Sequence, residues 1–171
     1  MKTILTAAII TISVALHAAD VTAKISNVHL CCKSCVTGVD KAVGTVTGVT
    51  AAVDKDAGTV TLTGPDAATV QKAADALVTA GYFGSSSDTA IKIKSSTGAK
   101  GQKVQTLQVN GVHLCCGKCV TAVDEALKAV PGVKSHTAEK GAKTFAVTGD
   151  FTDKDVFTSL QKAGLTGKVG Q

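Results

Sequence analysis

Two segments of the chain carry apolar residues every three or four positions, which is the pattern of a helix with one buried face. The apolar positions are Val36, Val39, Val43 and Val46 in the first segment and Val120, Val123, Leu127 and Val130 in the second. A short β-branched stretch precedes each segment, at 25–30 and 107–114, and predicts a strand. Each set of apolar positions forms one apolar stripe along its helix. Gly48 and Gly132 follow these two stripes, and we expect the glycines to end the helices.

Alternating apolar and polar residues after each helix predict a hairpin with one solvent-facing side. In the first half, residues 50–54 and 59–63 flank the turn at 55–58, and Val60 and Leu62 alternate with threonines. Phe145 and Val147 repeat this alternation in the second half. Each hairpin is therefore predicted to supply the second and third strands of a small sheet.

A second helix is predicted after each hairpin. Asp66 is placed to cap a helix that carries Val70, Ala74 and Leu77. In the second half, Thr152 with Asp155 is typical of a capping box, and it precedes a shorter helix with Val156 and Leu160. The final strands are expected at 90–94 and 166–169.

The two halves are copies of one another, offset by 84 positions. Between 28–49 and 112–133, 14 of 22 residues are identical. An internal repeat fixes the number of domains before the fold is considered. We predict an α+β protein of two tandem ferredoxin-like βαββαβ domains, at 24–94 and 104–171. The polar, glycine-containing segment 95–103 between them is predicted to be a flexible linker, so that each copy folds separately.

Residues 1–19 have the order of a secretory signal peptide. Lys2 forms a basic start, an apolar run covers 4–16, and Ala18 and Ala19 end the segment. The run is too short to cross a bilayer as a helix, which needs roughly 20 residues. We therefore expect cleavage near Asp20 and a periplasmic or secreted protein without a membrane span.

Composition excludes several functions. The formal net charge is +5, but the basic residues are scattered lysines without any arginine, and aromatic residues make up 3% of the chain. Nucleic-acid binding usually needs clustered basic residues and stacking rings, so it is not expected here. No catalytic triad, phosphate-binding loop or dinucleotide-binding glycine pattern occurs, so we expect no enzymatic activity.

The six cysteines lie in two identical His-x-Cys-Cys-x-x-Cys motifs and nowhere else. The motif residues are His29, Cys31, Cys32 and Cys35 in the first copy and His113, Cys115, Cys116 and Cys119 in the second. Disulfides that stabilise a small secreted domain close long loops, and cysteines bunched within five residues cannot do so. The start of a helix favours the thiolate form of a cysteine, because its N–H groups carry partial positive charge. Two to four such soft ligands suit Cu(I) or Zn²⁺.

Each copy resembles the heavy-metal-associated domain family, the ferredoxin-like module of copper chaperones, the periplasmic mercury-binding protein and the N-termini of metal pumps. The family signature Gly-Met-Thr-Cys-x-x-Cys corresponds here to 29–35 and 113–119. The resemblance implies that the family's metal-binding thiolates are Cys32 with Cys35 and Cys116 with Cys119. It extends to the turn at 80–82, where many bacterial members have a tyrosine near the metal loop.

Both motifs depart from this signature. Histidine replaces the family glycine, leucine replaces methionine, and cysteine replaces threonine, so His29, Cys31, His113 and Cys115 are additional candidate ligands. Three thiolates and a histidine would match tetrahedral zinc, whereas two thiolates suit linear Cu(I). The second copy also has Leu165 where the first has Tyr82.

The sequence thus predicts an exported protein that binds one copper(I) or zinc ion per copy, for metal buffering or for transfer to a metal transporter or another metal-accepting protein. The linker is expected to prevent obligatory sharing of ligands, so that each copy can hold its ion without the other. The alternative is a thiol–disulfide exchange protein, because Cys-x-x-Cys pairs also serve redox enzymes. His136 and Tyr82 are interpreted as structural, and Asp124 as part of a solvated helix face.

Overall fold

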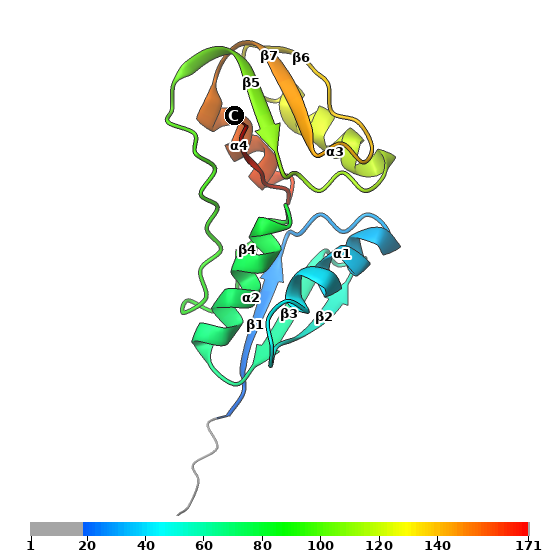
Figure 1. Cartoon of the computed structure of the whole chain (residues 1–171), viewed down its shortest axis with the longest axis vertical. Coiled ribbons are helices and arrows are strands. Elements are labelled where there is room, and N and C mark those ends of the chain that lie inside the picture. Colours follow the sequence, from blue (N-terminus) through cyan, green and yellow to red (C-terminus); the bar gives the residue numbers. More distant parts are fainter. Residues whose placement is uncertain (1–18, 171) are drawn as a thin grey trace, which may run out of the picture.

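The computed structural model describes residues 19–170, which fold into two copies of one arrangement stacked along the long axis of the molecule (Figure 1). The first copy contains β1 (Val21–Ser26), α1 (Lys33–Val43), β2 (Thr50–Asp54), β3 (Thr59–Gly64), α2 (Ala67–Thr79) and β4 (Ser85–Ser86). The second contains β5 (Lys103–Asn110), α3 (Gly117–Lys128), β6 (Val133–His136), β7 (Thr144–Thr152), α4 (Asp153–Lys162) and β8 (Lys168–Val169). Apart from Ala19, the predicted signal peptide lies outside the described residues.

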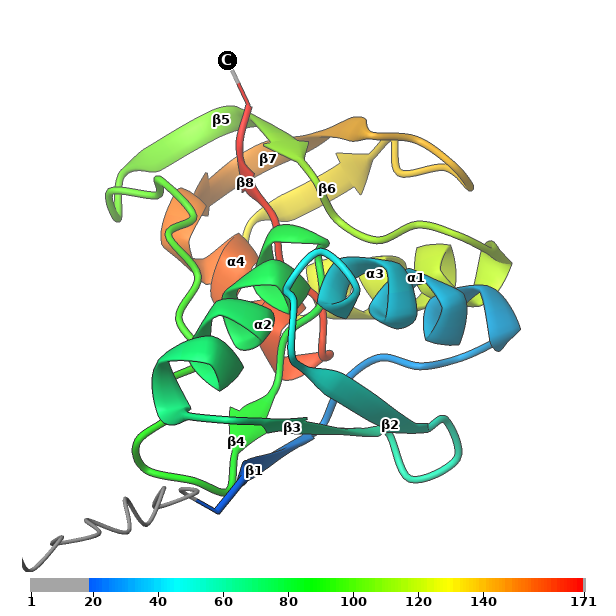
Figure 2. The ribbon, with the colours of Figure 1, turned by 60° about the horizontal axis from the view of Figure 1, so that its bottom comes forward.

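Each copy forms its own four-stranded antiparallel sheet. The strand orders are β2-β3-β1-β4 and β6-β7-β5-β8, and two helices cover one face of each sheet (Figure 2). In equivalent registers, Ile25 faces Val60 and Val109 faces Phe145. This order and connectivity are those of the ferredoxin-like βαββαβ fold, so the predicted fold class is confirmed.

The apolar residues predicted to lie on one face of each first helix are buried between the helices and the sheet. Val39 and Val43 of α1 are buried against alternate residues of the strands, such as Ile25 and Leu62. Val123 and Leu127 of α3 occupy the equivalent places in the second copy, as the helical periodicity predicted. Within the described residues, no helix is both long enough and apolar enough to span a membrane.

Two predictions about the ends of elements are wrong. The helices α1 and α3 end at Val43 and Lys128, and Gly48 and Gly132 instead occupy left-handed positions, with φ of 84° and 87°, in the turns before β2 and β6. The last strand of the first copy is at Ser85–Ser86, where it pairs with Ile25 and Ser26 of β1, and not at 90–94. Ile91 is buried, which accounts for the apolar signal there.

The helix starts also differ from expectation. The Asp66 carboxylate accepts a hydrogen bond from the Thr69 N–H, as a capping residue should. Thr152 lies at the start of α4 without a capping hydrogen bond, so the predicted capping box is wrong. The next residue, Asp153, is buried and accepts hydrogen bonds from the backbone N–H groups of 100–102.

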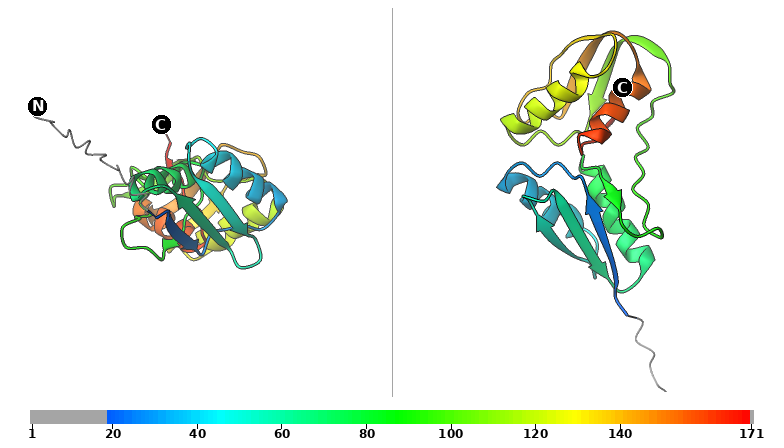
Figure 3. Two further views of the ribbon diagram at one scale, coloured as in Figure 1. Left: turned by 90° about the horizontal axis from the view of Figure 1, so that it is seen from below. Right: turned by 180° about the vertical axis from the view of Figure 1, so that it is seen from behind.

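Those hydrogen bonds attach the segment 95–103 to the second copy. Ser95 also contacts Thr166 by its hydroxyl, and the Thr97 carbonyl accepts from the Val169 N–H. Seen from behind, the segment passes along the α2 side of the first copy before it enters β5 (Figure 3). Flexibility of this linker and separate folding of the two copies stay predictions.

The two copies contact each other through equivalent turns. The turn after α2 holds Gly81 and Tyr82, and the turn after α4 holds Gly164 and Leu165. Tyr82 and Leu165 pair as an antiparallel bridge, and the glycine carbonyls accept hydrogen bonds from Thr166 N–H at 2.9 Å and Phe83 N–H at 3.1 Å. The contact is thus two-fold-like: the same surface is used by both copies.

Each glycine permits a close approach to the other copy's motif loop. A Cβ on Gly81 would lie 2.4 Å from the Gly111 carbonyl oxygen, and one on Gly164 would lie 2.5 Å from the Asn27 carbonyl oxygen. Both glycines have left-handed φ, 90° and 77°. Only glycine meets both demands, so these two residues set how closely the motif loops approach.

Candidate metal site

The fold places both cysteine motifs at equivalent strand-to-helix junctions. Cys32 and Cys116 are the N-cap residues of α1 and α3, with extended backbone, and Cys35 and Cys119 lie in the first turn, fully buried. The preceding Leu30 and Leu114, at 5% and 4% exposure, fill the core as plugs.

The six thiols converge in one cluster between the two copies. Within each Cys-x-x-Cys pair, the Sγ atoms are 3.7 Å apart for Cys32 and Cys35 and 3.9 Å apart for Cys116 and Cys119. The shortest Sγ–Sγ distance joins different copies: Cys31 and Cys116 are 3.3 Å apart. The two motifs therefore lie close enough for one ion to contact thiols of both, whereas the expectation that the linker prevents obligatory sharing of ligands stays a prediction.

Cys31 and Cys115 make the closest contacts across the interface. Cys31 Sγ lies 3.5 Å from Cys119 Sγ, and Cys115 Sγ lies 3.5 Å from Cys32 Sγ and 3.4 Å from Cys35 Sγ. Each also touches one thiol of its own copy at 3.6 Å. The cysteines that depart from the family signature are thus the ones that connect the two motifs.

The two motif histidines differ in their partners. Among the described residues, His29 Nε2 is buried without a hydrogen-bond partner, and the ring lies in one possible ligand group with Cys31 and Cys119. His113 Nε2 lies 3.0 Å from the Tyr82 hydroxyl, which also donates to the Cys35 carbonyl at 2.8 Å. Because that hydroxyl has one hydrogen, His113 Nε2 must be the donor to it. His29 is therefore free to bind an ion through Nε2, whereas His113 is not.

Charge is unevenly distributed at the centre of the cluster. Contacts with the Cys119 thiol, His113 and the Cys115 thiol lower the pKa of Cys35, against the opposing effect of burial. The contact with Cys35, together with burial, raises the pKa of Cys119. Within this buried pair Cys119 holds its proton more tightly than Cys35 does, and thiolate ligation of an ion would release protons.

Burial and neighbouring groups also change the pKa values of Cys31 and Cys116. Burial and the neighbouring Cys116 sulfur raise the pKa of Cys31 to about 12. Burial also acts to raise the pKa of Cys116, but the Cys119 N–H, the neighbouring Cys31 and Cys32 sulfurs and the Lys118 N–H outweigh it and lower the pKa to about 6. The N–H groups at the start of α3 thus favour the thiolate together with the neighbouring sulfurs.

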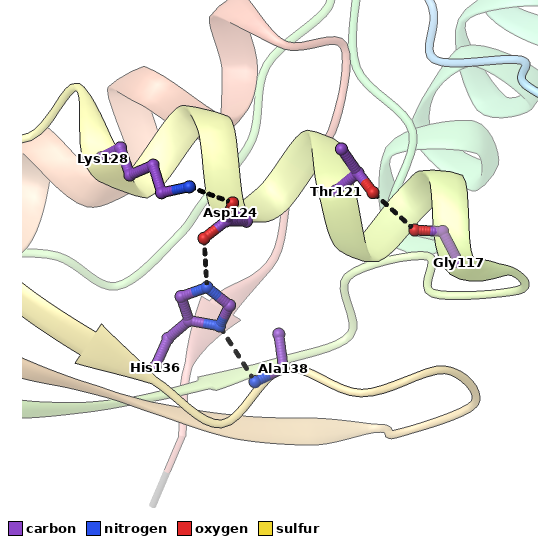
Figure 4. Close-up of polar contacts among 6 residues, drawn as sticks. All are labelled: Gly117, Thr121, Asp124, Lys128, His136 and Ala138. Carbon is purple, nitrogen blue, oxygen red and sulfur yellow. Dashed lines mark hydrogen bonds and ion pairs between the residues drawn. The ribbon is translucent and has the colours of Figure 1, made fainter.

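The third histidine of the described chain lies away from the cluster. In Figure 4, His136 of β6 points to Asp124 of α3, with Nε2 3.3 Å from the carboxylate, and its Nδ1 accepts from the Ala138 N–H. Lys128 pairs with the same carboxylate at 2.6 Å. Asp124 is thus an ion-pair partner and not an isolated residue on a solvated face.

The sequence did not identify Tyr82, Gly81 and Gly164 as parts of the site. The sequence places Tyr82 near its own metal loop, but its hydrogen bond to the other copy depends on how the copies stack. Glycine after a helix is common at the C-terminal end, so Gly81 and Gly164 carry no distinguishing signal.

Comparison with protein families identifies the second half of the chain. Residues 106–165 match the model of the heavy-metal-associated domain. The second copy belongs to this family. The first copy repeats its strand order and its cysteine motif, so the two form a tandem of heavy-metal-associated-like domains. A comparison with curated proteins finds no match.

Solved structures of similar domains were also found. A copper binding domain from HMA7, a P-type ATPase, is 22% identical and covers 40% of this chain and 96% of its own, with a TM-score of 0.37. The apo form of the domain from the copper chaperone for superoxide dismutase is 25% identical over 52% and 86%, with a TM-score of 0.35. The N-terminal soluble domains of Bacillus subtilis CopA are 15% identical over 90% and 95%, with a TM-score of 0.35.

Proposed function

We propose that this chain is an exported, non-enzymatic protein that binds a thiophilic metal ion, copper(I) or zinc, for buffering or for transfer to a metal transporter or another metal-accepting protein. The convergence of six thiols within 3.3–3.9 Å of their neighbours carries the proposal. Thiolates are the ligands that copper(I) and zinc prefer. The family match of the second copy supports the same reading.

The spacing of the thiols suits three- or four-coordinate binding. With metal–sulfur distances of about 2.3 Å, sulfurs lie roughly 3.8 Å apart around a tetrahedral ion and roughly 4.6 Å apart around a linear one. The Cys-x-x-Cys pairs, at 3.7 and 3.9 Å, match the first value. These pairs favour a site with more than two ligands.

The predicted signal peptide supports export, and export affects the chemistry. Thiols in an oxidising compartment form disulfides unless something protects them, and a bound ion does so. The first strand begins at Val21, so cleavage near Asp20 would leave the sheet intact. N-terminal sequencing of the exported protein should therefore begin near Asp20, and recovery of intact Met1 from that fraction would contradict export by cleavage.

Metal binding is tested on the anaerobically reduced full chain, by elemental analysis and by titration with Cu(I) or Zn²⁺ against a competing chelator. We expect bound metal, and replacement of Cys32, Cys35, Cys116 and Cys119 together by serine should abolish it. His136→Gln is the control, because this histidine lies away from the thiols. Affinity should fall as the pH is lowered, since protons compete for the thiolates.

Thiol–disulfide exchange is the second candidate function. Sulfur atoms 3.3–3.9 Å apart need only a small movement to reach the roughly 2.05 Å of a disulfide. If the reduced protein binds no ion at micromolar free metal but exchanges disulfides with a test dithiol, the metal proposal fails and this one replaces it.

A further inference from the structure

We propose that the third cysteine of each motif completes the metal site of the other copy. Cys31 joins Cys116 and Cys119, and Cys115 joins Cys32 and Cys35, so that each ion is held by three thiolates from two copies. The inference rests on the proposed metal-binding function and specifies which thiolates form each site.

The contacts form two closed triangles, and both cross the interface. In the first, the Cys31, Cys116 and Cys119 sulfurs are separated by 3.3, 3.5 and 3.9 Å. In the second, the Cys32, Cys35 and Cys115 sulfurs are separated by 3.7, 3.5 and 3.4 Å. The near-equality of the two sets follows from the two-fold-like stacking.

Thiols within one copy also approach one another. Cys31 lies 3.6 Å from Cys35, Cys115 lies 3.6 Å from Cys119, and the sulfurs of Cys115, Cys116 and Cys119 lie within 4.8 Å of one another. The crossed triangles are the ones in which all three sides are 3.9 Å or shorter. The third cysteine of each motif thus makes two contacts with the other copy and one with its own.

The size of each triangle suits a soft ion. Sulfurs about 3.6 Å apart surround a centre roughly 2.1 Å from each, which is close to the about 2.3 Å of a metal–thiolate bond, so three thiolates could hold one soft ion there. The glycines at 81 and 164 hold the motif loops close enough for both triangles to form.

The crossed arrangement is tested in a chain that retains one Cys-x-x-Cys pair. With Cys32→Ser and Cys35→Ser in the full chain, the remaining ion is held by Cys116 and Cys119. Adding Cys31→Ser should then weaken Cu(I) binding by more than about tenfold. Loss of even an outer-shell partner of a metal ligand lowers metal affinity by about tenfold or more, and Cys31 is proposed to be a direct ligand. Adding Cys115→Ser, which lies in the same motif as the remaining pair, should change the affinity little.

The mirror experiment reverses the roles. In a chain with Cys116→Ser and Cys119→Ser, Cys115→Ser should weaken binding and Cys31→Ser should not. X-ray absorption at the copper edge gives a second readout. It should count three sulfur neighbours in each paired background and two after the crossed cysteine is removed, whereas circular dichroism should show unchanged folding.

The outcomes separate this inference from the proposed function. If the unmodified chain binds no ion, metal binding itself fails. If it binds but the cysteine of the same motif is the one whose removal weakens binding, or if both removals weaken it equally, the crossed sites are wrong and the metal-binding function stands.

Discussion

The Tyr82 hydroxyl of the first copy lies 3.0 Å from Nε2 of His113 in the second copy, and the two rings contact each other at a 30° tilt with centroids 4.6 Å apart. The same hydroxyl donates to the Cys35 carbonyl in its own copy. One buried side chain therefore ties the first helix turn of one motif to the histidine of the other. No hydroxyl occupies the equivalent place beside His29, because that residue is Leu165.

Tyr82→Phe should destabilise the protein without changing its core volume. The variant leaves the Cys35 carbonyl and His113 Nε2 each short of one hydrogen bond, at a cost of about 1–3 kcal/mol in the free energy of unfolding. Urea denaturation of the reduced apo protein measures the change. Thr121→Val, which removes an exposed hydroxyl bonded to Gly117, is the control and should cost less than about 0.5 kcal/mol (Figure 4). Equal losses in the two variants would contradict the bridging role of Tyr82.

Gly81→Ala and Gly164→Ala should separate the two copies while each copy stays folded. The added Cβ would meet backbone of the other copy at 2.4 and 2.5 Å, and backbone atoms cannot move aside cheaply. Gly101→Ala is a matched control, since Gly101 has a similar φ of 75° but open space around its Cβ position. Small-angle scattering and amide spectra should show a changed relation between the copies in the first two variants only. A compact, unchanged molecule after Gly81→Ala would contradict the role of this contact.

His29→Gln and His113→Gln should differ in their effect on zinc binding. His29 Nε2 has no hydrogen-bond partner among the described residues, and the His29 ring lies in one possible ligand group with Cys31 and Cys119, so loss of this ring should remove a fourth ligand. His113 Nε2 is occupied by Tyr82, so its loss should lower stability more than zinc affinity. Chelator competition with Zn²⁺, with His136→Gln as the control, measures the difference. Equal zinc affinities for His29→Gln and the control would exclude His29 as a ligand.

Asp153→Asn should destabilise the chain at neutral pH and much less in acid. Burial acts to raise the pKa of this carboxyl, but backbone N–H groups, those of Lys100 and Gln102 foremost, outweigh it and hold the pKa below its ordinary value. A carboxyl with a lowered folded pKa stabilises the protein above its unfolded pKa of about 3.9, and this contribution is lost as the pH falls through the folded pKa. The expected loss is about 1–3 kcal/mol at pH 7.

Urea denaturation of wild type and Asp153→Asn between pH 7 and pH 3 tests this dependence. The difference between the two proteins should shrink as the pH falls. Asp155→Asn is the control, because Asp155 is an exposed carboxylate of the same helix turn. A pH-independent difference for Asp153→Asn would mean that the carboxylate charge contributes nothing to holding 100–102.

The sequence predicted the parts of the fold that depend on local pattern. Apolar residues recur every three to four positions in α1 and α3 and every two positions in the hairpin strands. These elements lie where that spacing predicted them. The strand β4 has only two residues, which is too short to show an alternation of apolar and polar positions. The strand was predicted at 90–94 instead, because that segment contains the apolar Ile91, which is buried. Local signals also overextended α1 and α3, since Val46 and Val130 continue the spacing beyond Val43 and Lys128.

The site was predicted residue by residue but not as an assembly. Its eight candidate ligands follow from the repeated motif, whereas the crossing of Cys31 and Cys115 depends on contacts between turns about 83 residues apart, such as Tyr82 with Leu165. Residue patterns within one copy contain no information about such pairing. The interpretation of Tyr82 as merely structural missed its second partner for the same reason.

Covalent connection of the two copies has a consequence for the cluster at low protein concentration. Two separate domains would have to meet before sulfurs from both could surround an ion, and dilution would drive them apart. Here the segment 95–103 holds the second motif near the first at an effective concentration of order millimolar, whatever the concentration of the protein. A cluster built this way assembles as a unimolecular step, so its metal affinity should not change between nanomolar and micromolar protein.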